Sequence, residues 1–131
     1  MRRILDTSIL IRKWRVSRSA SSRPPMVGDV ERWADEIVEF ERTHWIVTPV
    51  EIEFLAGVMS REELVLARAF LDRFELLDGG EVFSEDWDGA RQLACRVPRQ
   101  PRPRQLGDCL IRAIADRFGA DVTTSDLGFP S

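Results

Sequence analysis

The stretch RILDTSILI, residues 3–11, predicts how the rest of the chain is built. Its first residues are typical of a short buried strand that ends on an acid, Asp6. Thr7 and Ser8 then offer hydroxyl groups that can cap a helix starting at the next apolar residues. A strand that ends on an acid and leads directly into a helix is the first unit of an alternating α/β fold.

The remaining sequence repeats this alternation. Strands are predicted at 45–48, 75–77 and 121–124, and helices at 30–41, 50–58, 61–74, 85–97 and 107–118. The stretches 15–26 and 98–103 are rich in Ser, Arg and Pro and are predicted to be exposed loops. Short apolar strands joined by helices imply a parallel sheet that is covered on both faces. We therefore predict a three-layer α/β/α sandwich with a short central parallel sheet.

Composition limits the class of protein. With 131 residues, 44% of them hydrophobic, we expect one domain over residues 1–131 with a single core. The net charge of -3 identifies no partner, although arginine is nearly the only basic residue, Lys13 being the exception. The two cysteines lack the spacing of a disulfide framework or a zinc site. No apolar run approaches the roughly 18 to 20 residues that span a bilayer, so we expect a cytoplasmic protein without membrane contact.

Four acids are predicted to lie at one edge of the sheet. Asp6 and Asp126 each follow a strand, while Glu53 and Asp108 lie in the first turns of helices. In α/β sheets, the carboxyl ends of strands and the helices that start there share an edge. Each acid alone is more often a helix cap or a dipole partner, but four together favour a shared site. Glu51 lies two residues before Glu53 and points about 200° away around a helix.

Clustered carboxylates either raise the pKa of some members or attract a cation. An all-oxygen cluster suits Mg²⁺ or Mn²⁺ better than zinc. Such ions lower the pKa of bound water and stabilise the charge that develops during hydrolysis of a phosphodiester. That chemistry needs no side-chain nucleophile, which suits a chain whose only histidine is His44.

Several elements resemble the VapC-type toxins of the PIN-domain family. They are LDTSILI at 5–11, EFLAG at 53–57, DCLI at 108–111, and Thr124-Ser125-Asp126 with Phe129. Their order and approximate spacing are similar to those of the family over nearly the whole chain. The resemblance implies a PIN-like fold and selects Glu53 over Glu51.

The resemblance also implies roles for particular residues. One or two Mg²⁺ or Mn²⁺ ions would be held for endonucleolytic RNA cleavage by Asp6, Glu53, Asp108 and Asp126. Hydroxyl groups that orient these acids would come from Thr7, Ser8, Thr124 and Ser125. Two basic runs, 12–23 and 96–104, could form a groove for the RNA backbone or could equally be solvated surface loops. The candidates for phosphate contact are Arg12, Arg104 and Arg112. A toxin of this kind would form a homodimer and be inhibited by a VapB-like antitoxin. The helix predicted at residues 61–74 could bind that antitoxin, or it could be an ordinary core helix.

Other functions stay open at this point. Arg112 stands one turn after Asp108, where the family usually has a small residue, and could pair with that acid, weaken metal binding or grip phosphate. A catalytically weak PIN domain that binds RNA or a protein is therefore an alternative. Haloacid-dehalogenase-like phosphatases and response-regulator receivers also carry an acid after the first strand. Both rely on a lysine near the phosphate, whereas Lys13 lies in the first predicted helix.

Overall fold

A short parallel sheet runs through the middle of the molecule. The computed structural model describes residues 2–96, 103–126 and 128–130. Within them, one sheet has the order β3-β2-β1-β4 and consists of β1 (Arg3–Leu5), β2 (Trp45–Ile46), β3 (Glu75–Leu76) and β4 (Asp121–Thr123). Every neighbouring pair is parallel, with Ile4 aligned to Trp45 on one side and to Val122 on the other. The carboxyl ends of all the strands therefore lie at one edge, which we call the carboxyl edge.

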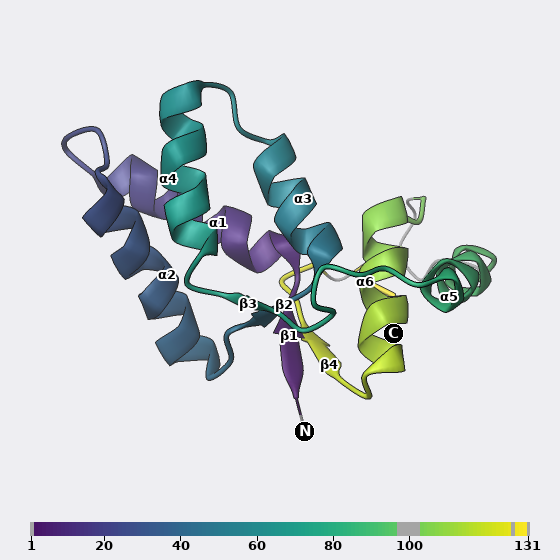
Figure 1. The fold of residues 1–131 in the computed structure, drawn as a ribbon. Helices are drawn as coiled ribbons and strands as arrows, with labels where there is room; N and C mark the ends of the chain where they lie inside the picture. The colour runs from purple at the N-terminus through teal and green to yellow at the C-terminus, as the bar shows by residue number, and fades with distance from the viewer. Residues whose placement is uncertain (1, 97–102, 127, 131) are drawn as a thin grey trace.

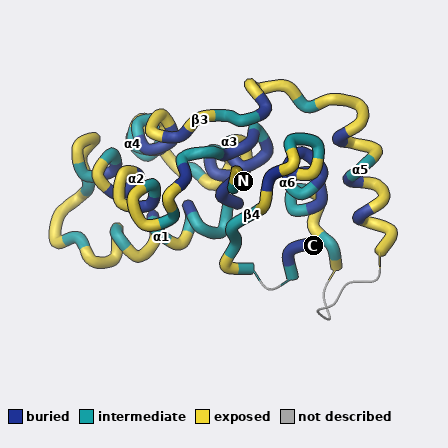
Figure 2. The backbone as a smooth tube through the Cα atoms, turned by 90° about the horizontal axis from the view of Figure 1, so that it is seen from below, coloured by how far each residue is buried: buried dark blue, intermediate teal, exposed yellow. Residues whose placement is uncertain are grey.

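Helices cover both faces of this sheet. In the described part of the chain they are α1 (Thr7–Ala20), α2 (Val27–Glu41), α3 (Thr48–Ala56), α4 (Arg61–Leu71), α5 (Ser84–Ala94) and α6 (Leu106–Arg117). Figure 1 shows α1, α2 and α4 on one side and α6 and α5 on the other, with α3 above the carboxyl edge. The view from below separates the same two groups (Figure 2). The predicted three-layer α/β/α sandwich is confirmed.

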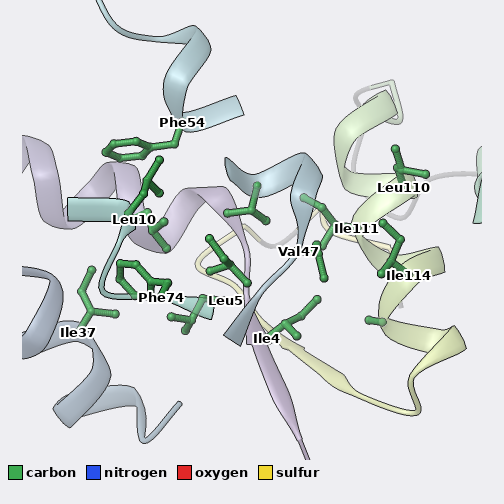
Figure 3. Close-up of a cluster of buried hydrophobic side chains, with 14 of the residues drawn as sticks. Ile4, Leu5, Leu10, Ile37, Val47, Phe54, Phe74, Leu110, Ile111 and Ile114 are labelled. Atoms are coloured by element: carbon green, nitrogen blue, oxygen red, sulfur yellow. The ribbon is translucent and has the colours of Figure 1, made fainter. Parts of the chain in front are cut away.

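The central strand is apolar because both of its faces are covered. Ile4 and Leu5 are completely buried. Successive side chains of a strand point to opposite faces, and in Figure 3 Leu5 lies toward Leu10 while Ile4 lies toward Ile114 of α6. The strand thus joins the cores of both helical layers, and its last residue leads directly to Asp6.

An aromatic cluster holds α3 over the sheet. The ring of Trp14 in α1 contacts Trp33, Phe54 and Phe70 edge-on, with ring centroids 5.6, 5.3 and 5.2 Å apart. Phe54 and Phe70 also stack on each other at 5.1 Å. Such aromatic pairs add about 1 kcal/mol each beyond the area they bury. Since Phe54 follows Glu53 directly, this cluster sets where α3 presents that acid.

The predicted exposed loop at 15–26 is wrong over its first part, because α1 continues to Ala20. Buried Trp14 anchors the last turns of the helix, and arginine and serine are acceptable helix residues once packing holds the segment. Helix α1 ends where Ser21 donates its backbone N–H to the carbonyl of Arg18, shortly before Pro24 and Pro25.

Acidic side chains neutralise part of the first basic run, residues 12–23. Three of its cations form ion pairs at 2.8–2.9 Å: Lys13 with Glu36, Arg18 with Glu63, and Arg23 with Asp29. The first basic run is therefore partly neutralised and lies mostly on α1, rather than in the exposed loop that was predicted. Residues 97–102 lie outside the described part of the chain. They include Arg99 and Arg102 of the second basic run, most of the loop predicted at 98–103, and Val97, the predicted end of the helix that starts at residue 85.

Other expectations change in detail. Helix α4 packs against α2 and buries Ala67, Phe70 and Leu71, which supports the core-helix interpretation of residues 61–74. Two large aromatic side chains, Trp87 and Phe40, are exposed. Both cysteines are free thiols. Among the helices described, none has the length and apolar character needed to cross a membrane.

Candidate active site

Asp6 is the buried centre of the candidate site at the carboxyl edge. Only 2% of the residue is exposed. Its Oδ1 accepts hydrogen bonds from the Ser8 backbone N–H (3.1 Å) and the Ser8 hydroxyl (2.5 Å), and its Oδ2 accepts one from the Thr124 hydroxyl (2.6 Å). Asp6 is therefore itself the N-cap of α1, not Thr7 or Ser8 as expected, because α1 already begins at Thr7.

The charge of Asp6 is poorly compensated by its neighbours. Burial raises the pKa of its carboxyl, and the hydrogen bonds from Ser8 and Thr124 oppose this only in part. In the described part of the chain, no basic side chain pairs with it. The equally buried Asp86, by contrast, is bound by the guanidinium of Arg117 at 2.7 Å. A buried carboxylate held only by neutral donors is one that a bound cation would stabilise.

Hydroxyl groups join the ends of β1 and β4. The Thr124 hydroxyl that donates to Asp6 also accepts from the Asp126 backbone N–H at 2.9 Å. The Ser8 hydroxyl accepts from the Ser125 N–H at 3.2 Å and lies 3.0 Å from the Ser125 hydroxyl. The Asp126 carboxylate in turn accepts from the Gly128 N–H at 2.9 Å. One hydroxyl thus connects the Asp6 carboxylate to the backbone of Asp126.

Glu53 connects the first turns of two other helices. It is an exposed residue of α3 whose Oε1 accepts a hydrogen bond from the Thr7 hydroxyl at 2.5 Å. Its carboxylate also lies against Gly107, where an added Cβ would be 2.7 Å from Glu53 Cδ. Gly107 directly precedes Asp108. The expectation that Glu53 lies in the first turn of its helix is wrong, because α3 already begins at Thr48 and its first-turn acid is Glu51. Glu51 takes no part in these contacts.

Intervening residues connect the chain positions of the four predicted acids one after another along the carboxyl edge. Asp126 is tied to Asp6 by Thr124, Glu53 to the start of α1 by Thr7, and Glu53 to the start of α6 by Gly107. Within residues 2–96, 103–126 and 128–130, no three His, Cys, Asp or Glu side chains are grouped closely enough to hold a metal ion. The donor set, carboxylate oxygen throughout, nevertheless has the chemistry that Mg²⁺ and Mn²⁺ prefer.

The predicted arginine contacts differ from one another. Arg112 does not pair with Asp108, because its Nε donates to the Pro130 carbonyl at 2.9 Å. Its ion-pair partner among the residues described is Asp116, at 3.9 Å, and its guanidinium lies 5.7 Å from the Phe129 ring centre. The side chain therefore turns toward the C-terminal segment. Arg104 lies half-buried before α6, and Arg12 lies exposed on α1.

Asp78 is a positioning residue that sequence reasoning missed. It follows β3 at the carboxyl edge and is buried. Its carboxylate accepts hydrogen bonds from the Thr48 backbone N–H (2.9 Å), the Thr48 hydroxyl (2.8 Å) and the Gly80 N–H (3.2 Å). It thereby satisfies the N-terminus of α3, the helix that carries Glu53. The sequence feature that could have identified Asp78 is an acid placed between a predicted strand and the turn residues Gly79-Gly80.

Asp78→Ala should lower the free energy of unfolding by about 2 kcal/mol, because three donors would lose their acceptor and two of them are at the start of α3. Urea denaturation of both proteins measures this. Asp72→Ala is the control, since Asp72 is exposed at the end of α4 and should change stability by less than about 0.5 kcal/mol. Equal denaturation midpoints for the Asp78 variant and the unmodified protein would show that this cap does not hold α3.

Comparison with known proteins identifies a family. The PIN domain family model matches residues 3–131, which includes all four acids and every element of the sheet. No curated protein matches the chain.

Proposed function

Because the chain belongs to the PIN-domain family, whose members are generally nucleases, we propose that it is an endoribonuclease dependent on Mg²⁺ or Mn²⁺. We further propose that it is the toxin of a type II toxin–antitoxin system. The observation that carries the catalytic proposal is the state of Asp6. Among the described residues, the hydrogen-bond donors to this buried carboxylate are all neutral. Thr124 connects it to Asp126, and Thr7, the next residue in the chain, binds Glu53.

In this proposal Asp6, Glu53, Asp108 and Asp126 hold the metal. When bound, the ion lowers the pKa of a water nucleophile and stabilises the charge that develops on the phosphodiester. The protein's own contribution is orientation. Thr124 and Ser8 fix both oxygens of the Asp6 carboxylate, Thr7 fixes Glu53, and Ser125 anchors the Ser8 hydroxyl. These are the four hydroxyl residues predicted from the sequence.

The RNA would approach over the carboxyl edge. We assign phosphate contacts to Arg12, exposed on α1, and to Arg104, two residues before the start of α6. Arg112 is not retained for this role, since the C-terminal segment engages its Nε.

The toxin assignment rests on the similarity of three sequence elements, 5–11, 53–57 and 108–111, to VapC-type toxins. It implies a VapB-like antitoxin and a homodimer as the assembled form. A short open reading frame for a small protein beside the gene would support it. A gene with no such neighbour would argue for a PIN-domain nuclease with another role.

A catalytically weak PIN domain that binds RNA or a protein is the second possibility. The feature that favoured it was Arg112, in a position from which it could neutralise Asp108. Since Arg112 binds Pro130 and approaches Asp116 instead, nothing about this arginine now argues against a metal site.

Metal removal tests the proposed function directly. We expect the protein to cleave a mixture of cellular RNAs with Mg²⁺ or Mn²⁺ present, and chelation with EDTA to lower the rate at least about 100-fold, since the ion supplies several kcal/mol of transition-state stabilisation. Re-addition of Mn²⁺ should restore the rate. Cleavage undiminished by EDTA would exclude the metal mechanism, and binding of RNA without any cleavage would favour the second possibility.

A further inference from the structure

Gly107 is the second residue of α6 and lies directly under the carboxylate of Glu53. A Cβ added at this position would overlap the Glu53 carboxylate, at 2.7 Å from Cδ and 3.1 Å from Oε1. A real Cβ is essentially never found within 3.0 Å of such an atom. The present position of the Glu53 carboxylate is therefore possible only because residue 107 has no side chain.

The helix itself does not require glycine here. Gly28 is likewise the second residue of its helix, α2, and a Cβ added to it would have nothing within 4 Å. At such a position alanine is ordinarily the better helix residue, by up to about 1 kcal/mol. Neither residue has a positive φ that would favour glycine. What distinguishes Gly107 from Gly28 is the neighbouring acid.

We propose that Gly107 is a positioning residue for Glu53, which keeps the Glu53 carboxylate beside the first turn of α6 and so beside Asp108. This inference rests on the proposed function, because it assigns a purpose to the place that Glu53 occupies. Two contacts define that place: the Thr7 hydroxyl donates to Oε1 on one side, and the bare Cα of Gly107 leaves room on the other. The acid is thereby held between the helix that Asp6 caps and the helix that contains Asp108.

Gly107→Ala should move the carboxylate without unfolding the protein. Glu53 is exposed, and the atoms that would collide are at the far end of a flexible side chain, so the side chain can turn away at little cost. The variant should be about as stable as Gly28→Ala, with a Tm no more than a few degrees from that of the unmodified protein. The Glu53 carboxylate, by contrast, can no longer occupy its present position beside the first turn of α6.

Metal affinity and NMR together test this inference. We expect Gly107→Ala to weaken Mn²⁺ binding on the order of tenfold when the affinity is measured by calorimetry, because it removes a feature that orients a metal ligand. Gly28→Ala is the control and should leave the affinity unchanged. In a Glu53→Ala background, Gly107→Ala should weaken it no further. NMR spectra are recorded without metal. Adding Glu53→Ala to the otherwise unmodified protein should shift the amide signals of residues 107 and 108. Adding it to the Gly107→Ala protein should leave those signals in place.

The outcomes separate the two proposals. If the unmodified protein binds Mn²⁺ and Gly107→Ala binds it equally well, the role of Gly107 is wrong while the proposed function stands. Amide signals that respond to Glu53→Ala equally in both backgrounds would overturn the placement of the carboxylate. If the unmodified protein binds no Mn²⁺, the proposed function is wrong, and the role of Gly107 fails with it.

Discussion

Asp6→Asn should reduce metal-dependent RNA cleavage by about a thousandfold, the loss expected when several kcal/mol of transition-state stabilisation are removed. Asparagine has nearly the shape of aspartate but lacks the charge that would hold the ion. The fold should persist, because the amide oxygen can accept from the Ser8 N–H and hydroxyl as Oδ1 does now, and the amide nitrogen can donate to the Thr124 hydroxyl. Removing a buried charge also removes its desolvation cost.

The measurement is the single-turnover cleavage rate of an RNA that the unmodified protein cuts, together with circular dichroism of both proteins. Glu51→Gln is the matched control: Glu51 lies on the same helix as Glu53, outside the contacts of the site, and the variant should cleave at the unmodified rate. Equal cleavage by the Asp6→Asn and unmodified proteins would rule out the metal site. If the protein is a toxin, expression of Asp6→Asn should also leave growth of a bacterial host unaffected.

The place of Asp6 at the end of β1 could be predicted from sequence because its causes are local, although its role as the N-cap of α1 was not predicted. A short apolar strand, an acid at its end and a following helix are all within a few residues, and the parallel topology then brings Asp126 to the same edge. The length of α1 could not be predicted in this way. Its final turns have the composition of a loop, and it is the packing of Trp14 against Phe54 and Phe70 that makes them helical.

The finer parts of the site depend on contacts between distant segments. Gly107 looks like an ordinary glycine near a helix start, and only the position of Glu53 against it shows why a side chain is excluded. Arg112 shows the converse, since its spacing from Asp108 made an ion pair one of three predicted roles, whereas the C-terminal segment provides a carbonyl acceptor at Pro130 and a buried ring at Phe129. Spacing along one helix identifies possible partners, and tertiary packing then selects among them.

Asp86→Ala should be the most destabilising change of an acid in the chain, lowering the free energy of unfolding by about 3 kcal/mol or more. The Asp86 side chain is completely buried at the start of α5 and receives two hydrogen bonds from Arg117 of α6, at 2.7 and 3.0 Å. These bonds raise the pKa of the Arg117 guanidinium, so this arginine stays charged at neutral pH. Helix α5 packs against α6 at the outside of the molecule (Figure 1), and the ion pair between Asp86 and Arg117 connects the two helices.

Two further variants separate the ion pair from the helix cap that the same carboxylate provides. Asp86 Oδ2 also accepts from the Phe83 N–H at 2.8 Å, a bond that Asp86→Asn can keep while losing the charge. Asp86→Asn should therefore cost less than Asp86→Ala, by about the 1 kcal/mol of a cap. Asp88→Ala breaks the exposed pair with Arg91 one turn away and should cost less than about 0.5 kcal/mol. Urea denaturation measures all three, and an Asp86→Ala protein as stable as Asp88→Ala would mean that α5 is held by apolar packing alone.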